Sequence, residues 1–308
     1  MFLICGEALY DVFVGAGDDP ASFPLRAQAG GSPFNVALGL ARMEEPVGLL
    51  TGLSRDVLGT RLFSMLEREG VATDYLMRTD RPTTVVLVTL TDDGQPSYVF
   101  YGGDSADCGV TSAELPVLGP EISGIHFGSY SLVVEPVADA FASLLPDLGE
   151  RFVSLDPNIR PTIEPDMGVW QARVQSYAEH ADLVKISAED IDLLYPGRTH
   201  EALAEALLGS GAKLVVVTDG GAPVRAWTQS GLRAEVAPLV SDVVDTVGAG
   251  DTFQAALIAR LHQLGDPKSR VAALQQSDLD DLLAYAARAA AITCSRRGAD
   301  LPRLSELG

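Results

Sequence analysis

Four short apolar runs alternate with helical patterns between residues 124 and 218, and this alternation restricts the fold more than any other feature. The runs cover residues 124–127, 152–156, 183–186 and 213–218, and the helical patterns cover residues 135–146, 169–181 and 199–209. Repeated strand–helix units form a parallel sheet that is covered by helices on both faces. The sequence therefore predicts a three-layer α/β fold with a central, mostly parallel sheet.

The N-terminal part of the chain continues this pattern. Residues 2–5 and 47–51 are apolar runs typical of buried strands, and residues 33–43 and 56–69 carry apolar side chains at helical spacing. With 308 residues, of which 47% are hydrophobic, the chain has enough apolar material for one large core. We therefore predict a single domain over residues 1–308.

Residues 83–104 depart from this alternation. Residues 83–90 and 97–101 are rich in β-branched and aromatic side chains, and Asp92-Asp93-Gly94 between them favours a hairpin turn. No helical pattern follows the first arm, so we predict a small antiparallel lid formed by about 12–30 and 83–104. Tyr98 and Phe100 would either line a ligand there or pack against a partner subunit. The exposed edges of such a lid favour a homodimer.

The charge of the chain excludes several kinds of partner. Lys and Arg number 22 and Asp and Glu 42, so the formal net charge is −20 and the chain should repel nucleic acids and anionic membranes. Three widely spaced cysteines, Cys5, Cys108 and Cys294, argue against a disulfide framework or a zinc site. The N-terminus lacks a signal-peptide pattern and no apolar run is long enough to span a membrane. We expect a cytoplasmic protein.

The strongest candidate for a functional site is the small-residue stretch 244–253. Gly248, Ala249 and Gly250 stand where a turn opens into a helix, which leaves backbone N–H groups free to hold an anion. Asp251 faces the same space, and an anion cradle beside a carboxylate suits phosphoryl transfer to a hydroxyl. The alternative is an Asp that only caps the helix. The stretch is neither a Walker loop nor a dinucleotide-binding fingerprint.

Polar residues follow several of the predicted strands. Asp11 comes after the predicted strand at residues 2–5. Residues 156–160, 185–190 and 218–221 lie at the ends of the predicted strands at 152–156, 183–186 and 213–218. Ligands of open α/β sheets bind at the carboxyl ends of strands, so these residues should share one rim with Asp251. Asp11 would accept hydrogen bonds from sugar hydroxyls, or else form a turn.

These segments resemble the ribokinase-like (phosphofructokinase B) family of sugar kinases along nearly the whole chain. The resemblance rests on residues 245–251, on Gly30-Gly31 with Asn35, and on residues 6–9, 126–129, 156–161, 185–187 and 295–299. Within the family, bacterial fructokinases are the most similar. The resemblance implies a ribokinase-like fold and transfer of the γ-phosphoryl group of ATP to a sugar hydroxyl.

The resemblance also implies a role for each part of the rim. Asp251 would be the general base, and the backbone of Gly248, Ala249 and Gly250 would form the anion hole. The residues implied to bind the sugar are Asp11, Gly30, Gly31, Asn35, Asn158 and Arg160, with Tyr98 and Phe100 from the lid. The residues implied around the nucleotide are Lys185, Ser187, Thr218, Gly220, Gly221, Thr246, Ala286 and Ala290. The nucleotide loop departs from the family pattern, because Pro223 occupies a position where a glycine is usual.

Two metal sites follow from the resemblance. Mg²⁺ would be held through water by Asp190, or by its neighbour Glu189, because Asp190 stands at a position where the family usually has glutamate. A monovalent cation such as K⁺ would lie near Asp245, Val247 and Gly298.

The choice of sugar has competing readings. A 2-keto-3-deoxygluconate kinase shares the Asp-x-Asn-x-Arg element at residues 156–160, but residues 98–104 supply none of the cations that an acidic sugar should need. A neutral sugar, fructose, is therefore preferred. A reading from another class is a sugar-binding regulator without catalysis, against which Asp251 and the intact Gly-Ala-Gly turn argue.

Overall fold

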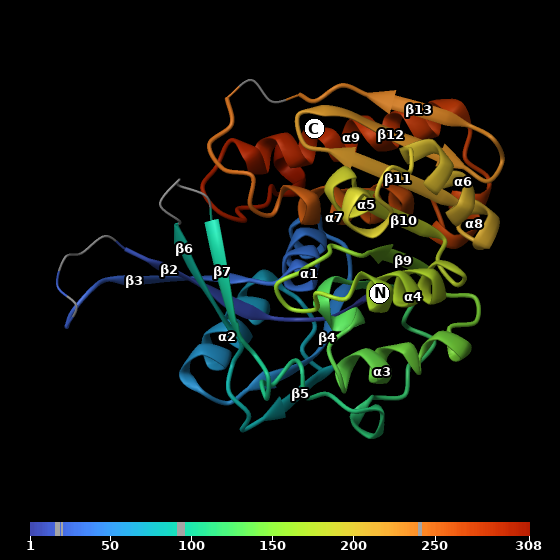
Figure 1. Ribbon diagram of the computed structural model, residues 1–308. Helices are drawn as coiled ribbons and strands as arrows, with labels where there is room; N and C mark the ends of the chain where they lie inside the picture. Colours follow the sequence, from blue (N-terminus) through green and yellow to red (C-terminus); the bar gives the residue numbers. More distant parts are fainter. Residues whose placement is uncertain (16–18, 20, 91–95, 240–241) are drawn as a thin grey trace.

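The chain folds around a nine-stranded sheet in the order β13-β12-β11-β10-β9-β8-β1-β4-β5 (Figure 1). This computed structural model describes residues 1–15, 19, 21–90, 96–239 and 242–308. The strands are β1 Phe2–Cys5, β4 Val47–Ser54, β5 Leu76–Thr79, β8 Gly124–Gly128, β9 Phe152–Asp156, β10 Leu183–Ser187, β11 Leu214–Asp219, β12 Ala222–Thr228 and β13 Arg233–Val236. Neighbours from β11 to β5 pair in parallel, whereas β12 and β13 add an antiparallel edge. The predicted parallel sheet is confirmed.

Helices cover both faces of this sheet. Alternate residues of β1 point to opposite sides, so Phe2 and Ile4 belong to one hydrophobic cluster and Leu3 and Cys5 to the other. The first cluster includes side chains of α1 Ser32–Arg42, α2 Val57–Glu69, α7 Ala249–Gln263, α8 Pro267–Ala272 and α9 Gln276–Cys294. The second includes side chains of α3 Val137–Ala142, α4 Met167–Ala178, α5 Ala188–Leu194 and α6 His200–Ser210. The predicted three-layer architecture is therefore confirmed.

Short 3₁₀ turns complete the connections between these elements. They are η1 Ser112–Glu114, η2 Ser129–Leu132, η3 Leu145–Asp147 and η4 Leu304–Glu306. Among the described residues, no helix has both the length and the apolar character that crossing a membrane requires.

A second, smaller sheet projects from the body as the predicted lid (Figure 1). Its order is β3-β2-β6-β7, with β2 Leu9–Val14, β3 Leu25–Gly30, β6 Val85–Leu90 and β7 Pro96–Tyr101. The pairs β2–β3 and β6–β7 are antiparallel, whereas β2 and β6 run parallel, because the chain passes through α1 to β5 between them. The turn predicted at residues 92–94 lies outside the described residues.

Candidate active site

Asp251 lies in the first turn of α7 and is 8% exposed. The turn before it depends on Gly248, whose φ of 78° is left-handed. A Cβ atom at Gly248 would lie 2.6 Å from the Cβ atom of Ala299, so a side chain would not fit there either. The backbone thus turns sharply into the helix and places Asp251 on the rim of the sheet.

The N-terminus of α1 faces Asp251. The Ser32 hydroxyl donates to Asp251 Oδ1 and the Asn35 amide donates to Asp251 Oδ2, each at 2.7 Å. These hydrogen bonds join segments 219 and 216 residues apart in the sequence. Both donors are buried, so the carboxylate is held in one orientation. Asn35 was predicted here and Ser32 was missed, although positions 32 and 35 share one face of a helix.

In the turn at residues 246–252, two of the three backbone N–H groups predicted to bind an anion are free to do so. Thr252 donates from its backbone N–H and from its hydroxyl to the carbonyl oxygen of Gly248, both at 2.8 Å, which fixes the turn. The N–H of Ala249 already donates to the carbonyl oxygen of Thr246 at 3.2 Å. Within the described part of the chain, the N–H groups of Gly248 and Gly250 have no hydrogen-bond partner.

Asp11 reaches the same rim from the lid strand β2. A Cβ atom at Gly30 would lie 2.5 Å from Asp11 Oδ2, so the glycine makes room for this carboxylate. Burial raises the pKa of Asp11 to about 6; the nearby Arg160 lowers it and Asp251 raises it. Arg160 is exposed and donates to the carbonyl oxygen of Ile159 at 2.9 Å. Asp11, Arg160 and Asp251 therefore interact electrostatically, as residues around one ligand should.

Two further residues of the predicted sugar set occupy left-handed backbone. Gly31 precedes α1 with a φ of 106°, and a Cβ atom there would lie 2.7 Å from the carbonyl oxygen of Glu7. Asn158 has a φ of 46° and is partly buried after β9. Asparagine tolerates this conformation better than most residues.

Lys185 and Asp156 form a buried ion pair beneath the α7 turn. Lys185 Nζ donates to Asp156 Oδ2 at 2.7 Å, with side-chain exposures of 5% and 0%. Lys185 Nζ would lie 3.1 Å from a Cβ atom at Gly250, so its charge adjoins the predicted anion hole. Burial raises the pKa of Asp156 to about 6; Lys185 lowers it, and Asp190 and Asp251 raise it. From the sequence, Lys185 was predicted to contact the nucleotide, and no role was predicted for Asp156.

The predicted magnesium residues lie at the start of α5. Asp190 accepts hydrogen bonds from the N–H groups of Ile159 at 2.8 Å and Ser187 at 3.3 Å, while Glu189 is exposed. In the described ranges, no group of three or more His, Cys, Asp or Glu residues could by itself hold a metal ion. Mg²⁺ commonly keeps several waters and needs only one or two carboxylates. The carboxylates near this rim therefore fit a water-bound Mg²⁺, and Asp156 Oδ1, which is buried without a hydrogen-bond partner among the described residues, is a further acceptor oxygen there.

Asp245 brings together the residues predicted for a monovalent cation. Its carboxylate accepts from the N–H of Gly298 at 2.8 Å and from the N–H of Val247 at 3.1 Å. Thr246, in the same loop, is exposed. Gln28 of the lid strand β3 also reaches this loop, because its Nε2 atom would lie 3.0 Å from a Cβ atom at Gly298. The loop and the lid are thus in contact.

The predicted nucleotide loop is a tight turn between β11 and β12. Thr218 ends the parallel part of β11, and Gly220 has a φ of 48°. A Cβ atom at Gly220 or Gly221 would meet nothing within 4 Å, so this turn is open to a ligand. Pro223, which stands where the family pattern has a glycine, lies inside β12.

The two alanines predicted near the adenine differ in exposure. Ala286 is fully enclosed in the hydrophobic core, so in this structure it presents no surface to a nucleotide. Ala290, one turn further along α9, is only partly buried and remains a candidate.

Comparison with known proteins assigns the family. The profile described as "pfkB family carbohydrate kinase" matches residues 9–306. The chain belongs to the pfkB family of carbohydrate kinases. A fructokinase of Rhizobium leguminosarum bv. trifolii is 38% identical to this kinase over 267 residues, which is 85% of this chain and 79% of that protein. Fructokinase-1 of Oryza sativa subsp. japonica is 32% identical over 302 residues, or 96% and 91% of the two chains.

Solved structures agree with this assignment of the kinase. A fructokinase of Xylella fastidiosa with bound ATP superimposes with a TM-score of 0.89 at 27% identity, over 99% of this chain and 96% of that one. A fructokinase of Vibrio cholerae O395, in a form with fructose, ADP and calcium bound, gives a TM-score of 0.83 at 25% identity, over 99% and 97%.

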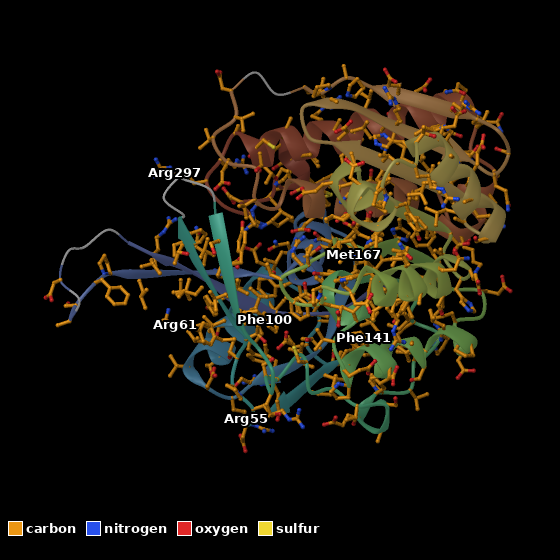
Figure 2. All side chains as sticks on the ribbon, in the orientation of Figure 1. Arg55, Arg61, Phe100, Phe141, Met167 and Arg297 are labelled. Atoms are coloured by element: carbon orange, nitrogen blue, oxygen red, sulfur yellow. The ribbon has the colours of Figure 1, made fainter. Side chains whose placement is uncertain are left out.

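The lid of this pfkB kinase presents its aromatic residues on two faces. Phe100 of β7 is labelled in Figure 2. Its ring packs edge-on against Tyr130 of the body, with 5.2 Å between ring centroids. Tyr98 shares that side of β7 by strand alternation and is 48% exposed. Val99 and Tyr101 point to the opposite face and are also exposed.

Proposed function

We propose that this chain is an ATP-dependent fructokinase, in which residues 1–308 form one kinase domain. The observation that carries the proposal is Asp251, held by Ser32 and Asn35 next to open backbone N–H groups at the start of α7. The names of its relatives support fructose as the acceptor, and their printed ligands support ATP as the donor.

Asp251 is the general base of this proposal. An ionised carboxylate that accepts two hydrogen bonds keeps further lone pairs for a third donor, the acceptor hydroxyl of the sugar. As the sugar oxygen attacks the γ-phosphoryl group in line, the bond to the β-phosphate oxygen breaks, ADP leaves, and Asp251 takes the proton of the sugar hydroxyl. The N–H groups of Gly248 and Gly250, with the Lys185 charge behind them, stabilise the negative charge of the transferring group.

The sugar is held between the lid and the body. Asp11 accepts hydroxyl hydrogen bonds, and the backbone at Gly30 and Gly31 lets the sugar approach closely. Asn35, Asn158 and Arg160 complete the polar contacts. Tyr98 and Phe100 lie on the body side of the lid, where they limit access of water.

The nucleotide lies across Thr218, Gly220 and Gly221 toward Ser187, Thr246 and Ala290. Asp190 or Glu189 would hold Mg²⁺ through water, and the ion would offset the charge of the phosphates. Asp245, Val247 and Gly298 would lie near a bound K⁺.

The chain acts as a homodimer in the cytoplasm. Exposed apolar side chains on the outer face of the lid, Leu25, Val99 and Tyr101, support self-association there. Three buried free cysteines suit a reducing compartment.

A coupled assay of ADP release tests the substrate. The purified chain is given ATP and Mg²⁺ with fructose, 2-keto-3-deoxygluconate, ribose or adenosine, and we expect the highest kcat/KM with fructose. A preference for another acceptor would overturn the fructokinase proposal while leaving the family unchanged. ADP release with none of them would favour a binding protein without kinase activity.

A further inference from the structure

A buried carboxyl group supports the hydrogen bonds that hold Asp251. Glu7 lies two residues after the end of β1 and is 2% exposed. Its Oε1 atom accepts from the backbone N–H of Ser32 at 3.3 Å, and the hydroxyl of Ser32 donates to Asp251 Oδ1 at 2.7 Å. One residue therefore links the Glu7 carboxyl to the carboxylate of Asp251.

The same segments also fit closely in their backbone. A Cβ atom at Gly31 would lie 2.7 Å from the carbonyl oxygen of Glu7 and 3.2 Å from its Cγ atom. A Cβ atom at Gly6 would lie 2.2 Å from Cγ of Pro33. The start of α1 thus rests on the turn at residues 6–7, and a shift of Glu7 would move Ser32.

The surroundings of Glu7 favour its neutral form. The polar and titratable groups that face it are Ser32 of α1, Asp107 and Cys108 after β7, Ser129 and Tyr130 of η2, and Arg160 after β9. Asp107 accepts from three hydroxyl groups, those of Thr84, Ser105 and Tyr130. By contrast, Glu7 Oε2 is buried and has no hydrogen bond of normal geometry among the described residues.

Two buried carboxyl groups in such different environments should have different pKa values. Burial raises the pKa of Glu7 to about 8; the Ser129 hydroxyl and Arg160 lower it, and Asp107 raises it. The pKa of Asp107 is also raised by burial, against its three hydroxyl donors. Below its raised pKa, Glu7 is a neutral carboxylic acid.

We infer that Glu7 is a positioning residue, which holds the Gly31–Ser32 turn so that Ser32 keeps Asp251 aimed at the acceptor hydroxyl. This inference rests on the proposed kinase function. Ionisation of Glu7 would place a buried charge beside the Asp107 carboxyl, in a protein that must also accept an anionic nucleotide. The charge would be relieved by hydration and movement of the turn, so turnover should fall as pH rises through the pKa of Glu7.

The test compares wild type, Glu7→Gln and Glu7→Ala as complete chains, with fructose and ATP–Mg²⁺ from about pH 6 to about pH 10. We expect kcat of wild type to decrease above an apparent pKa near 8. Glu7→Gln keeps an acceptor for the Ser32 N–H and stays neutral, so it should retain kcat within about threefold and lose this decrease. Glu7→Ala should lower kcat about 10–100-fold with a smaller change in KM, since misplacement of a catalytic group has effects of this size.

Two further readouts separate positioning from a general loss of structure. The decreases in kcat caused by Ser32→Ala and by Glu7→Ala should be less than additive in the double variant, because both changes act through the same Glu7–Ser32–Asp251 link. Infrared difference spectra between wild type and Glu7→Gln should show the C=O stretch of a protonated carboxyl near neutral pH. Its absence there, or an unchanged alkaline decrease in Glu7→Gln, would overturn the inference. If Glu7→Ala does not fold, wild type and Glu7→Gln still decide. Absence of phosphoryl transfer by wild type would refute the proposed function instead.

Discussion

Replacing Gly248 with alanine should reduce both stability and turnover. The backbone of Gly248 has a φ of 78°, which residues with a Cβ atom rarely adopt. The new Cβ atom would lie 2.6 Å from Cβ and 3.0 Å from Cα of Ala299, well inside van der Waals contact. Relief requires movement either of the α7 turn or of the loop that follows Gly298.

The structure supplies a matched control for the size of this effect. Gly70 ends α2 with a φ of 82°, but a Cβ atom there would meet nothing within 4 Å. Gly70→Ala should therefore cost only the left-handed backbone, about 1–2 kcal/mol. Gly248→Ala adds an overlap that costs about 1–3 kcal/mol more in a packed region.

Urea denaturation and steady-state kinetics measure the two effects. Gly248→Ala should lose more unfolding free energy than Gly70→Ala and lower kcat about 100-fold, because an anion-binding N–H is displaced. Gly70→Ala should keep the kcat of wild type. Equal destabilisation of the two variants, with near-normal turnover of Gly248→Ala, would refute the reasoning.

Three other perturbations have defined outcomes. Lys185→Met should lower the unfolding free energy by about 3–5 kcal/mol in urea denaturation, since it leaves Asp156 buried without its cation. Adding Asp156→Leu should restore much of this free energy. If the double variant shows no recovery, the ion-pair account is contradicted. Because the pKa of Asp11 is raised to about 6, kcat/KM for the sugar should decrease as pH falls below that value and the carboxyl takes up a proton. This decrease should be absent in Asp11→Asn. If the decrease persists in Asp11→Asn, it belongs to another group. Tyr101→Asp should shift the chain from dimer to monomer in size-exclusion chromatography with light scattering, and an unchanged mass would rule out the lid interface.

Much of the fold could be predicted because helices and buried strands carry different hydrophobic periods. The strands β8 to β11, the helices α4 and α6, and the lid hairpin were predicted close to their observed bounds, whereas α5 was not predicted. The edge strands β5, β12 and β13 were missed, since their partly exposed, mixed sequences lack a continuous apolar run. The helix predicted at 135–146 is only α3 at 137–142, with Pro136 and Pro146 near its ends and a 3₁₀ turn after it.

The sequence could predict which residues form the site, but not which side chains form hydrogen bonds or ion pairs with each other there. Strand ends with polar residues and the turn before Asp251 indicated the rim. The bond from Ser32 to Asp251 and the pair Lys185–Asp156 depend on how distant segments meet. Pairing of β9 with β10 brings Leu155 opposite Val184, and the next residues are Asp156 and Lys185. Sequence alone does not supply that register.

Asp251→Asn tests the central claim, that this carboxylate takes the proton of the acceptor hydroxyl. The variant keeps the shape of the side chain. Its amide oxygen can still accept from Ser32, and its amide nitrogen can donate to the Asn35 oxygen once the Asn35 amide is turned over. Turnover with fructose and ATP–Mg²⁺ should fall about 10²–10⁴-fold, the range for loss of a positioned general base, while calorimetry shows fructose binding retained. Turnover within a few-fold of wild type, with fructose still bound, would contradict the account.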